Sequence, residues 1–294
     1  MWQYAQELCV LPLGELRVYR RDVLVSAGRS PMIVLLVTAH PLSASLTVAL
    51  ASVARDALVR AGHTVLESHL YEMGWDAVVR EEQFAEPVSG TEPIGDRSAF
   101  AYRSGTLPSD VVVEQEKLRR ADLVMFHFPL WWYGMPAILK GWFDRVFVKG
   151  YAFGVKDPSG RTRKYGDGGL AGKRALIVVN AGDRPTAFGS RGLNGEASEL
   201  FFPITHGIFW YTGMQPLEPH LVAGADRPAW DGFEGEAARL RDRLAHIGDE
   251  PGIEYRRLDS GDYDGHRILR PEIRSGETGV RIHLHQHHGT EGAA

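Results

Sequence analysis

The chain has 294 residues, of which 44% are hydrophobic and 24% charged, a composition typical of a globular protein with a sizeable core. A formal net charge of -4 at pH 7 argues against a basic face that binds nucleic acid. The most apolar run, Met32 to Ala39, is far shorter than the roughly 20 residues that cross a bilayer, and the single cysteine, Cys9, excludes a disulfide within the chain. We therefore expect a cytoplasmic protein.

Residues 1–31 differ from the rest of the chain. They place several arginines around a weak strand pattern, LRVYRRDVLV, whereas continuous apolar patterning starts only at Met32 with MIVLLVTAH. We expect three parts: an N-terminal extension over residues 1–31, either loosely attached or preceding a natural start at Met32; one domain over residues 32–250; and an irregular tail over residues 251–294.

Within the expected domain, apolar runs alternate with segments of helical spacing. Strands are expected at Ile33–Ala39, His63–Leu70, Asp122–Phe128, Arg174–Gly182 and Leu217–Val222. Helices are expected at Ser45–Ala61, Pro108–Arg120, Met135–Val148, residues 194–212 with an interruption near Pro203, and Glu234–Ile247. Residues 83–109 and 156–173 are rich in loop-forming residues and should be loops or lids.

Continuous apolar strands that alternate with helices indicate a parallel sheet covered on both faces. Five such strands predict an α/β, doubly wound, flavodoxin-like fold with strand order 2-1-3-4-5. Ligands of such sheets bind beyond the carboxyl ends of the strands, so the loops after the first, third and fourth strands should form a site.

The first of these loops, residues 39–47, has the sequence AHPLSASLT and runs into a helix N-terminus, whose free N–H groups favour a phosphate. It contains neither a dinucleotide fingerprint nor a P-loop. A serine here could equally be an ordinary helix cap. The loop alone leaves both interpretations open.

The second loop, residues 129–134, carries three large rings, Trp131, Trp132 and Tyr133. Aromatic triplets are more often packing residues than cofactor contacts, yet this one should lie beside the first loop and could stack on a planar cofactor ring. The third loop, residues 180–183, contains a glycine that allows a close backbone approach. In the helix after the aromatic rings, Lys140 and Asp144 have the i, i+4 spacing of an ion pair.

The stretch FPLWWYGMPAILKGWFDRVF, residues 128–147, closely resembles the signature of the NAD(P)H quinone reductases, the DT-diaphorase family of flavodoxin-like flavoproteins. The resemblance continues in VTAHP at 37–41, in EQEKLRRADLVMFHFPL at 114–130 and in GMQPLEPHL at 213–221. It implies a homodimer with the active site at the subunit interface and bound FAD, with FMN as an open alternative. It also implies ping-pong hydride transfer from NAD(P)H through flavin N5 to a quinone-like acceptor.

The resemblance assigns roles by position. The diphosphate and ribityl chain would contact His40, Ser45, Leu46 and Thr47. The isoalloxazine would lie against Pro129, Leu130, Trp131, Trp132 and Tyr133, and its polar edge would contact Asn180, Ala181, Gly182 and Asp183. The substrate side would be lined by Ala152, Phe153 and Gly154.

The chain departs from the best-known members at the catalytic positions. Those members place a Tyr and a His near the flavin, and the corresponding residues here are Phe188 and Asn194. Phenylalanine donates no hydrogen bond, and asparagine does not titrate near neutral pH. The proton would then come from solvent or from another residue, such as His40 or His206.

Three alternatives remain open in the sequence. Some relatives are flavin-bound regulatory subunits of potassium-efflux systems. A one-electron carrier of the flavodoxin type is disfavoured by the extra length and by the aromatic GYAFG segment at 150–154. The tail motif HLHQHH, with His283, His285, His287 and His288, could bind a metal, although a solvated terminal segment is favoured.

Overall fold

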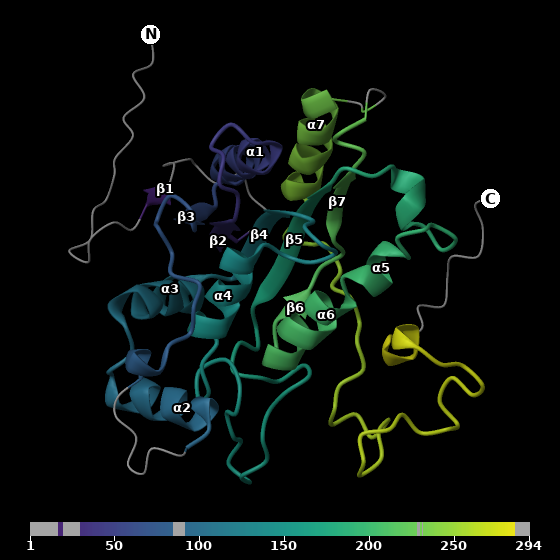
Figure 1. Ribbon diagram of the computed structural model, residues 1–294. Coiled ribbons are helices and arrows are strands. Elements are labelled where there is room, and N and C mark those ends of the chain that lie inside the picture. The colour runs from purple at the N-terminus through teal and green to yellow at the C-terminus, as the bar shows by residue number, and fades with distance from the viewer. Residues whose placement is uncertain (1–16, 20–29, 85–91, 228–229, 231, 286–294) are drawn as a thin grey trace.

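The computed structural model describes residues 17–19, 30–84, 92–227, 230 and 232–285 (Figure 1). Most of the expected N-terminal extension, and the tail residues His287 and His288, lie outside the described residues.

A parallel sheet forms the centre of the domain. Its strands are β2 (Ile33–Thr38), β3 (Thr64–His69), β4 (Leu123–Pro129), β5 (Arg174–Ala181) and β7 (His220–Ala223). They lie in the order β3-β2-β4-β5-β7, which confirms the predicted order 2-1-3-4-5. Two short strands extend this sheet: β1 (Val18–Tyr19) pairs antiparallel with β3, and β6 (Gln215–Pro216) pairs with the start of β5.

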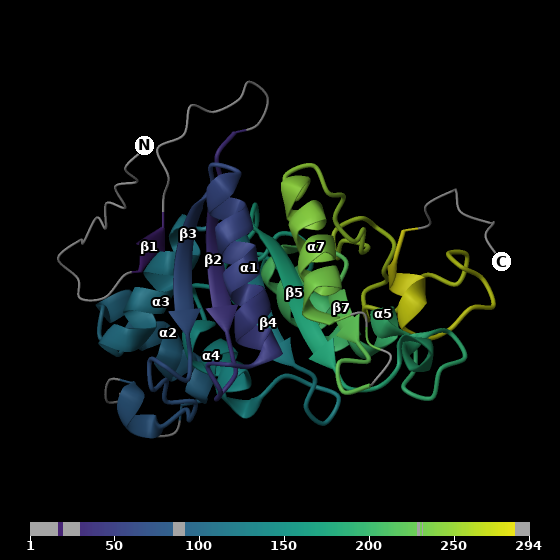
Figure 2. The same cartoon turned by 90° about the horizontal axis from the view of Figure 1, so that it is seen from above.

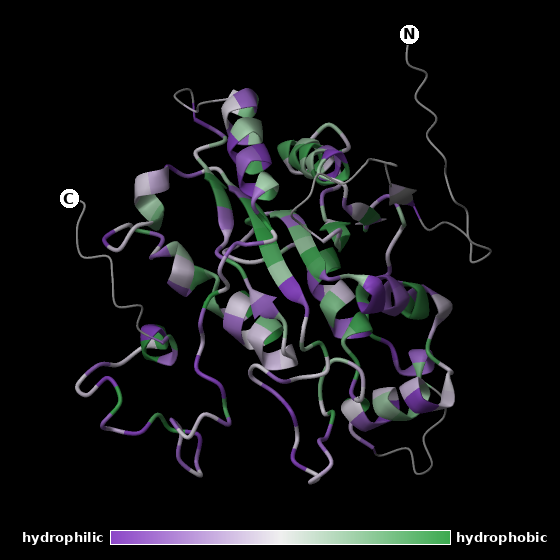
Figure 3. Ribbon diagram, turned by 180° about the vertical axis from the view of Figure 1, so that it is seen from behind, coloured by the Kyte–Doolittle hydropathy of each residue, from purple (hydrophilic) through white to green (hydrophobic). Residues whose placement is uncertain are grey.

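Helices cover both faces of the sheet (Figure 1). Helices α1 (Leu46–Arg60) and α7 (Gly232–Ala245) pack on the face that includes Val34 and Leu36. Helices α3 (Ser109–Arg120) and α4 (Ala137–Val146), with the π-helical turn η3 (Thr205–Trp210), pack on the opposite face with Leu35 and Phe126. Each strand therefore buries both of its faces, which explains the continuous apolar runs and the hydrophobic strands at the centre of Figure 3.

One segment differs from the sequence-based expectation, and a second shows the interruption that was expected near Pro203. Helix α2 (Ile94–Ser104) forms within residues 83–109, begins after Pro93 and ends at Gly105, whose φ of 70° gives a left-handed C-terminal cap. The helix expected over 194–212 is broken into α5 (Ala197–Leu200), α6 (Phe202–Ile204) and η3, with a proline at the break. Short 3-10 turns occur at η1 (Glu81–Gln83), η2 (Pro185–Phe188) and η4 (Val280–His283). Among the helices of the described ranges, none is both long and apolar enough to span a membrane.

The C-terminal tail docks on η3 through stacked rings. His206 stacks on Phe202 at a centroid distance of 4.5 Å and on His283 at 5.8 Å, and Tyr263 stacks on His283 at 5.9 Å. Burial lowers the pKa of His206 to about 4. Because His283 is part of this stack, we assign it a packing role, and the described residues contain no cluster of three groups suited to a metal ion.

Candidate active site

The three loops expected to form a site lie together. Because the strands are parallel, their carboxyl ends point to one side of the sheet (Figure 2). The rings of His40 and Trp131 are 6.0 Å apart between centroids, which joins the first loop to the second. The side-chain amide of Asn180 donates to the hydroxyl of Thr47 at 2.9 Å, which joins the third loop to the start of α1.

The first loop is shaped by its own side chains. Ser45 is the N-cap of α1, and its hydroxyl accepts the N–H of Val48 at 3.3 Å, so it does cap the helix as one interpretation held. The ring of His40 accepts the N–H of Leu42 at 3.0 Å. The first turn of α1 still offers the N–H groups that any helix leaves without helical partners, and these face the end of the sheet where a phosphate would bind.

One polar atom among these loops has no partner within the chain. The side-chain oxygen of Asn180 is buried and has no hydrogen-bond partner among the described residues. Leaving a buried polar group unpaired costs about 1–3 kcal/mol, so such groups in native proteins normally meet a ligand or water. The unpaired oxygen next to Thr47 is therefore consistent with a polar ligand bound at this point.

The second loop is a tight hairpin. Trp131 and Gly134 exchange two backbone hydrogen bonds of 3.0 Å, and the two residues between them, Trp132 and Tyr133, have φ values of 51° and 59°. Two positive φ values in a two-residue loop define a type I′ turn, which strongly favours Asn-Gly. The Trp132 side chain is 99% exposed and that of Tyr133 58%, so packing within this chain does not account for the strained conformation. Strain of this kind concentrates at functional sites.

The third loop is bonded to the second through Asn194. The amide oxygen of Asn194 accepts the Tyr133 hydroxyl at 3.0 Å, and its amide nitrogen donates to Asp183 at 3.1 Å. Arg227, which follows β7, donates to the other carboxylate oxygen of Asp183 at 3.0 Å. The backbone N–H of Arg184, then Asn194 and Arg227, lower the pKa of Asp183, which is therefore ionised at neutral pH. Arg227 was not among the residues identified from the sequence.

The remaining expected site residues differ from one another in burial. Phe188 is buried and packs with Ala181 and Ala187, next to Leu130 of the second loop, so it presents an apolar wall. In the segment expected to line the substrate side, the Ala152 side chain is fully buried in the core, whereas Phe153 and Gly154 stay partly exposed.

A rigid support stands behind the aromatic loop. The carboxylate of Glu114 accepts the Trp142 indole N–H at 2.8 Å, the Lys117 ammonium at 2.7 Å and the Ser68 hydroxyl at 2.7 Å, all in the interior. These bonds connect β3, α3 and α4, and α4 starts directly after the loop. On the exposed face of α4, Lys140 pairs with Asp144 at 2.6 Å, as its spacing predicted.

Comparisons with known proteins agree with this fold. A family model described as flavodoxin-like fold matches residues 32–244. The chain is 38% identical over 257 residues to "Ribosyldihydronicotinamide dehydrogenase-like protein traD" of Penicillium crustosum, covering 86% of this chain and 95% of that one. It is also 38% identical over 192 residues to "NAD(P)H dehydrogenase [quinone] 1" of Rattus norvegicus, covering 64% and 67%. The crystal structure of a putative quinone reductase from Klebsiella pneumoniae superimposes with a TM-score of 0.82 at 40% identity, covering 86% of this chain and all of that one.

Proposed function

This chain belongs to the flavodoxin-like family and, within it, to the flavin-dependent NAD(P)H:quinone reductases, and on that premise we propose that it binds FAD at the three loops and reduces a quinone with NAD(P)H. The observation that supports the proposal most directly is the convergence of the loops, in which Asn180 bonds to Thr47 and His40 lies beside Trp131. The loops proposed to bind the phosphate, the ring face and the polar edge of the flavin therefore share one end of the sheet.

The residues of the site fit a flavin. The N-terminus of α1 and Thr47 would hold the phosphate and ribityl groups, because free helical N–H groups and the helix dipole favour an anion. The unpaired oxygen of Asn180 would accept a hydrogen bond from the bound cofactor. Leu130 and the hairpin rings would lie against its planar ring system. When bound, the flavin supplies the acceptance and donation of hydride, and the protein supplies position and electrostatics.

Among the described residues, the side chains near the polar edge include no proton donor suited to neutral pH. Asp183 is ionised, Asn194 does not titrate, and Phe188 has no proton to give. The hairpin, in contrast, is open to water at Trp132. We infer that the proton consumed in quinone reduction comes from solvent, whereas Asn194 acts by holding Tyr133 and Asp183 in place.

We also propose that two copies of the chain form a homodimer over this site. The second loop exposes three large rings, Trp131, Trp132 and Tyr133, which is unusual for a surface loop. A second copy packed against part of these rings would complete an apolar pocket for the quinone. The measurement is the molar mass in solution by light scattering, with a dimer expected.

The cofactor test is the absorption spectrum of the purified protein together with the mass of the released group. We expect one FAD per chain and steady NAD(P)H oxidation with a simple benzoquinone. Release of FMN would correct the cofactor alone. Bound flavin without turnover would favour a regulatory subunit instead, and a protein that neither contains nor takes up flavin would contradict the proposal.

A matched pair of variants tests the hairpin. Tyr133→Phe removes the hydroxyl that Asn194 accepts, and one such bond is worth about 0.5–1.5 kcal/mol, so the flavin dissociation constant should rise roughly two- to tenfold. Tyr71→Phe removes an exposed hydroxyl outside the three loops and should leave flavin binding unchanged. Equal effects of the two substitutions would show that the hairpin is not part of the site.

A further inference from the structure

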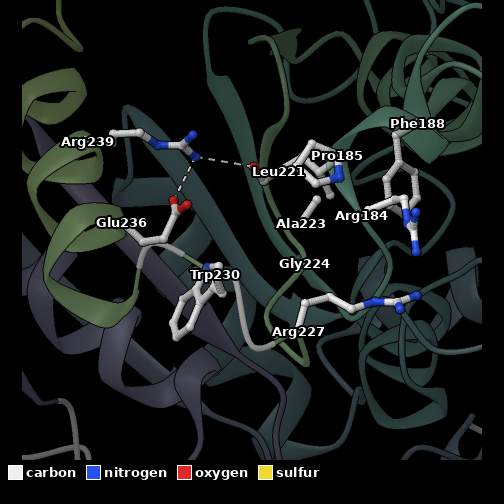
Figure 4. Close-up of a pocket in the computed structure, with 10 residues that line it drawn as sticks. All are labelled: Arg184, Pro185, Phe188, Leu221, Ala223, Gly224, Arg227, Trp230, Glu236 and Arg239. Atoms are coloured by element: carbon white, nitrogen blue, oxygen red, sulfur yellow. Dashed lines mark hydrogen bonds and ion pairs between the residues drawn. The ribbon is translucent and has the colours of Figure 1, made fainter.

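A pocket of about 340 Å³ lies beside the three loops, against the free edge of β7 (Figure 4). Its walls come from residues 184–188 after β5, from β7 and the turn after it, and from α7. The volume is in the range of small-ligand pockets. Apart from Phe188, which was expected near the flavin, no residue assigned to the cofactor lines it, so most of the pocket lies outside the three loops.

The pocket adjoins the proposed cofactor site through one shared ring. Phe188 lines the pocket, and it also packs with Ala181, next to Leu130, in the flavin loops. A second connection is the bond from Arg227, another pocket residue, to Asp183. A ligand in the pocket could therefore extend past Phe188 toward the place where hydride is transferred.

The apolar part of the pocket offers flat rings. Phe188 and the indole of Trp230 lie on different sides of it, with Leu221 from β7 between them (Figure 4). The indole N–H of Trp230 is buried and has no hydrogen-bond partner among the described residues. A heteroaromatic ring with acceptor nitrogens would match both properties, since it can stack and can accept this N–H.

In the charged part of the pocket, one of three guanidinium groups has no carboxylate partner among the described residues. Arg239 pairs with Glu236 at 2.7 Å, and Arg227 pairs with Asp183 at 3.0 Å. Arg184 makes no side-chain hydrogen bond or ion pair within the part of the chain that the structure describes. Two of the three guanidinium groups that line the pocket are thus paired with a carboxylate, and that of Arg184 is not. This balance suits a single phosphate group rather than a polyphosphate, and guanidinium groups bind phosphate through paired N–H donors.

We propose that this pocket binds the adenosine end of NADPH, with the 2′-phosphate at Arg184, and so makes the enzyme prefer NADPH to NADH. The inference rests on the proposed function, because that reaction consumes a dinucleotide whose nicotinamide must reach the three loops. An adenine ring and one phosphate monoester are the features that the rings and the unpaired guanidinium match. The adenosine of FAD has a similar chemistry and is the other ligand that could fill the pocket. The experiment below distinguishes the two.

The experiment compares three donors in steady-state kinetics with a benzoquinone: NADPH, NADH and dihydronicotinamide riboside, which lacks the adenosine. Arg184→Ala should raise KM for NADPH about tenfold, the loss expected for one charge-assisted contact at an open site, and change KM for the other two donors less than twofold. Arg184→Lys should restore part of the preference. Trp230→Ala should raise KM for NADPH and NADH alike and spare the riboside.

Arg241→Ala is the matched control, because Arg241 is an exposed arginine of α7 that does not line the pocket. It removes the same charge and should leave all three KM values unchanged. Higher salt should weaken the NADPH preference of the wild type, since Arg184 is exposed to solvent.

Three outcomes would overturn the assignment. An unchanged KM for NADPH in Arg184→Ala, or an equal change for all three donors, would show that the pocket does not recognise the phosphate. Loss of flavin from Arg184→Ala would assign the pocket to the adenosine of the cofactor. Failure of the proposed function can be told apart from failure of this assignment. In that case the wild-type protein would hold no flavin or oxidise none of the three donors.

Discussion

Replacing Trp132 by asparagine should make the protein more stable and a poorer enzyme. Trp132 has φ of 51° in a type I′ turn, a position where asparagine is favoured and a bulky side chain is strained. An L-residue in this conformation costs roughly 1–2 kcal/mol, and asparagine avoids part of that cost. Because the side chain is 99% exposed, the substitution removes almost no packing within the chain. A gain of about 1 kcal/mol follows.

The assay is thermal and urea unfolding of flavin-free protein, in which about 1 kcal/mol corresponds to a rise in Tm of roughly 2–4 °C. The flavin dissociation constant should rise roughly two- to tenfold, the equivalent of one lost aromatic contact of about 0.5–1.5 kcal/mol. Leu193→Asn is the control, since Leu193 is 94% exposed and is not among the residues with positive φ. The reasoning is refuted if Trp132→Asn lowers the Tm, or if it stabilises no more than the control.

Three further predictions concern the loops and the sheet. Thr47→Val removes the hydroxyl that Asn180 bonds and leaves a buried amide unpaired, so urea unfolding should show a loss of about 1–3 kcal/mol; no loss would mean that this bond does not tie the loops together. The rate of quinone reduction by the wild type should vary little between pH 6 and 8. The double variant Phe188→Tyr with Asn194→His should instead show a single-proton change of this rate near the histidine pKa of about 6.5. Such a change in the wild type would contradict the proposal that the proton comes from solvent. Burial holds the pKa of His127 at about 3, so the stability that comes from keeping it neutral is complete above about pH 6.5 and is lost as pH falls toward 3. His127→Gln should flatten the dependence of the unfolding free energy on pH by up to about 1.4 kcal/mol per pH unit. An unchanged slope would show that His127 is not held neutral.

The sheet was predictable because each central strand buries both faces, and a continuous apolar run such as Ile33–Thr38 is hard to mistake. Helix α2 was not predictable for a related reason. It buries only small side chains, Ser98, Ala99 and Ala101, so its sequence has little apolar periodicity. The interruption near Pro203 was expected, because proline cannot donate the backbone hydrogen bond of a helix interior, whereas the π-helical turn that follows was not.

The convergence of the three loops followed from strand order, since loops after parallel strands must meet at one end of the sheet. Contacts between distant segments did not follow. The bond between Tyr133 and Asn194 spans 61 residues, and no local pattern indicates it. The pocket of Arg184 and Trp230 likewise depends on how the segment after β5 and helix α7 approach the edge of β7, which spacing along the chain does not reveal.

The buried carboxylate of Glu114 limits how far the aromatic hairpin and its support can be re-engineered. It is the common acceptor for donors from β3, α3 and α4, and removing one partner of a buried ion pair typically costs 3–5 kcal/mol. A natural domain has only about 5–15 kcal/mol of stability in total. Libraries that reshape the aromatic hairpin to accept new substrates should therefore keep Glu114, Lys117 and Trp142 constant and place their diversity in the exposed turn.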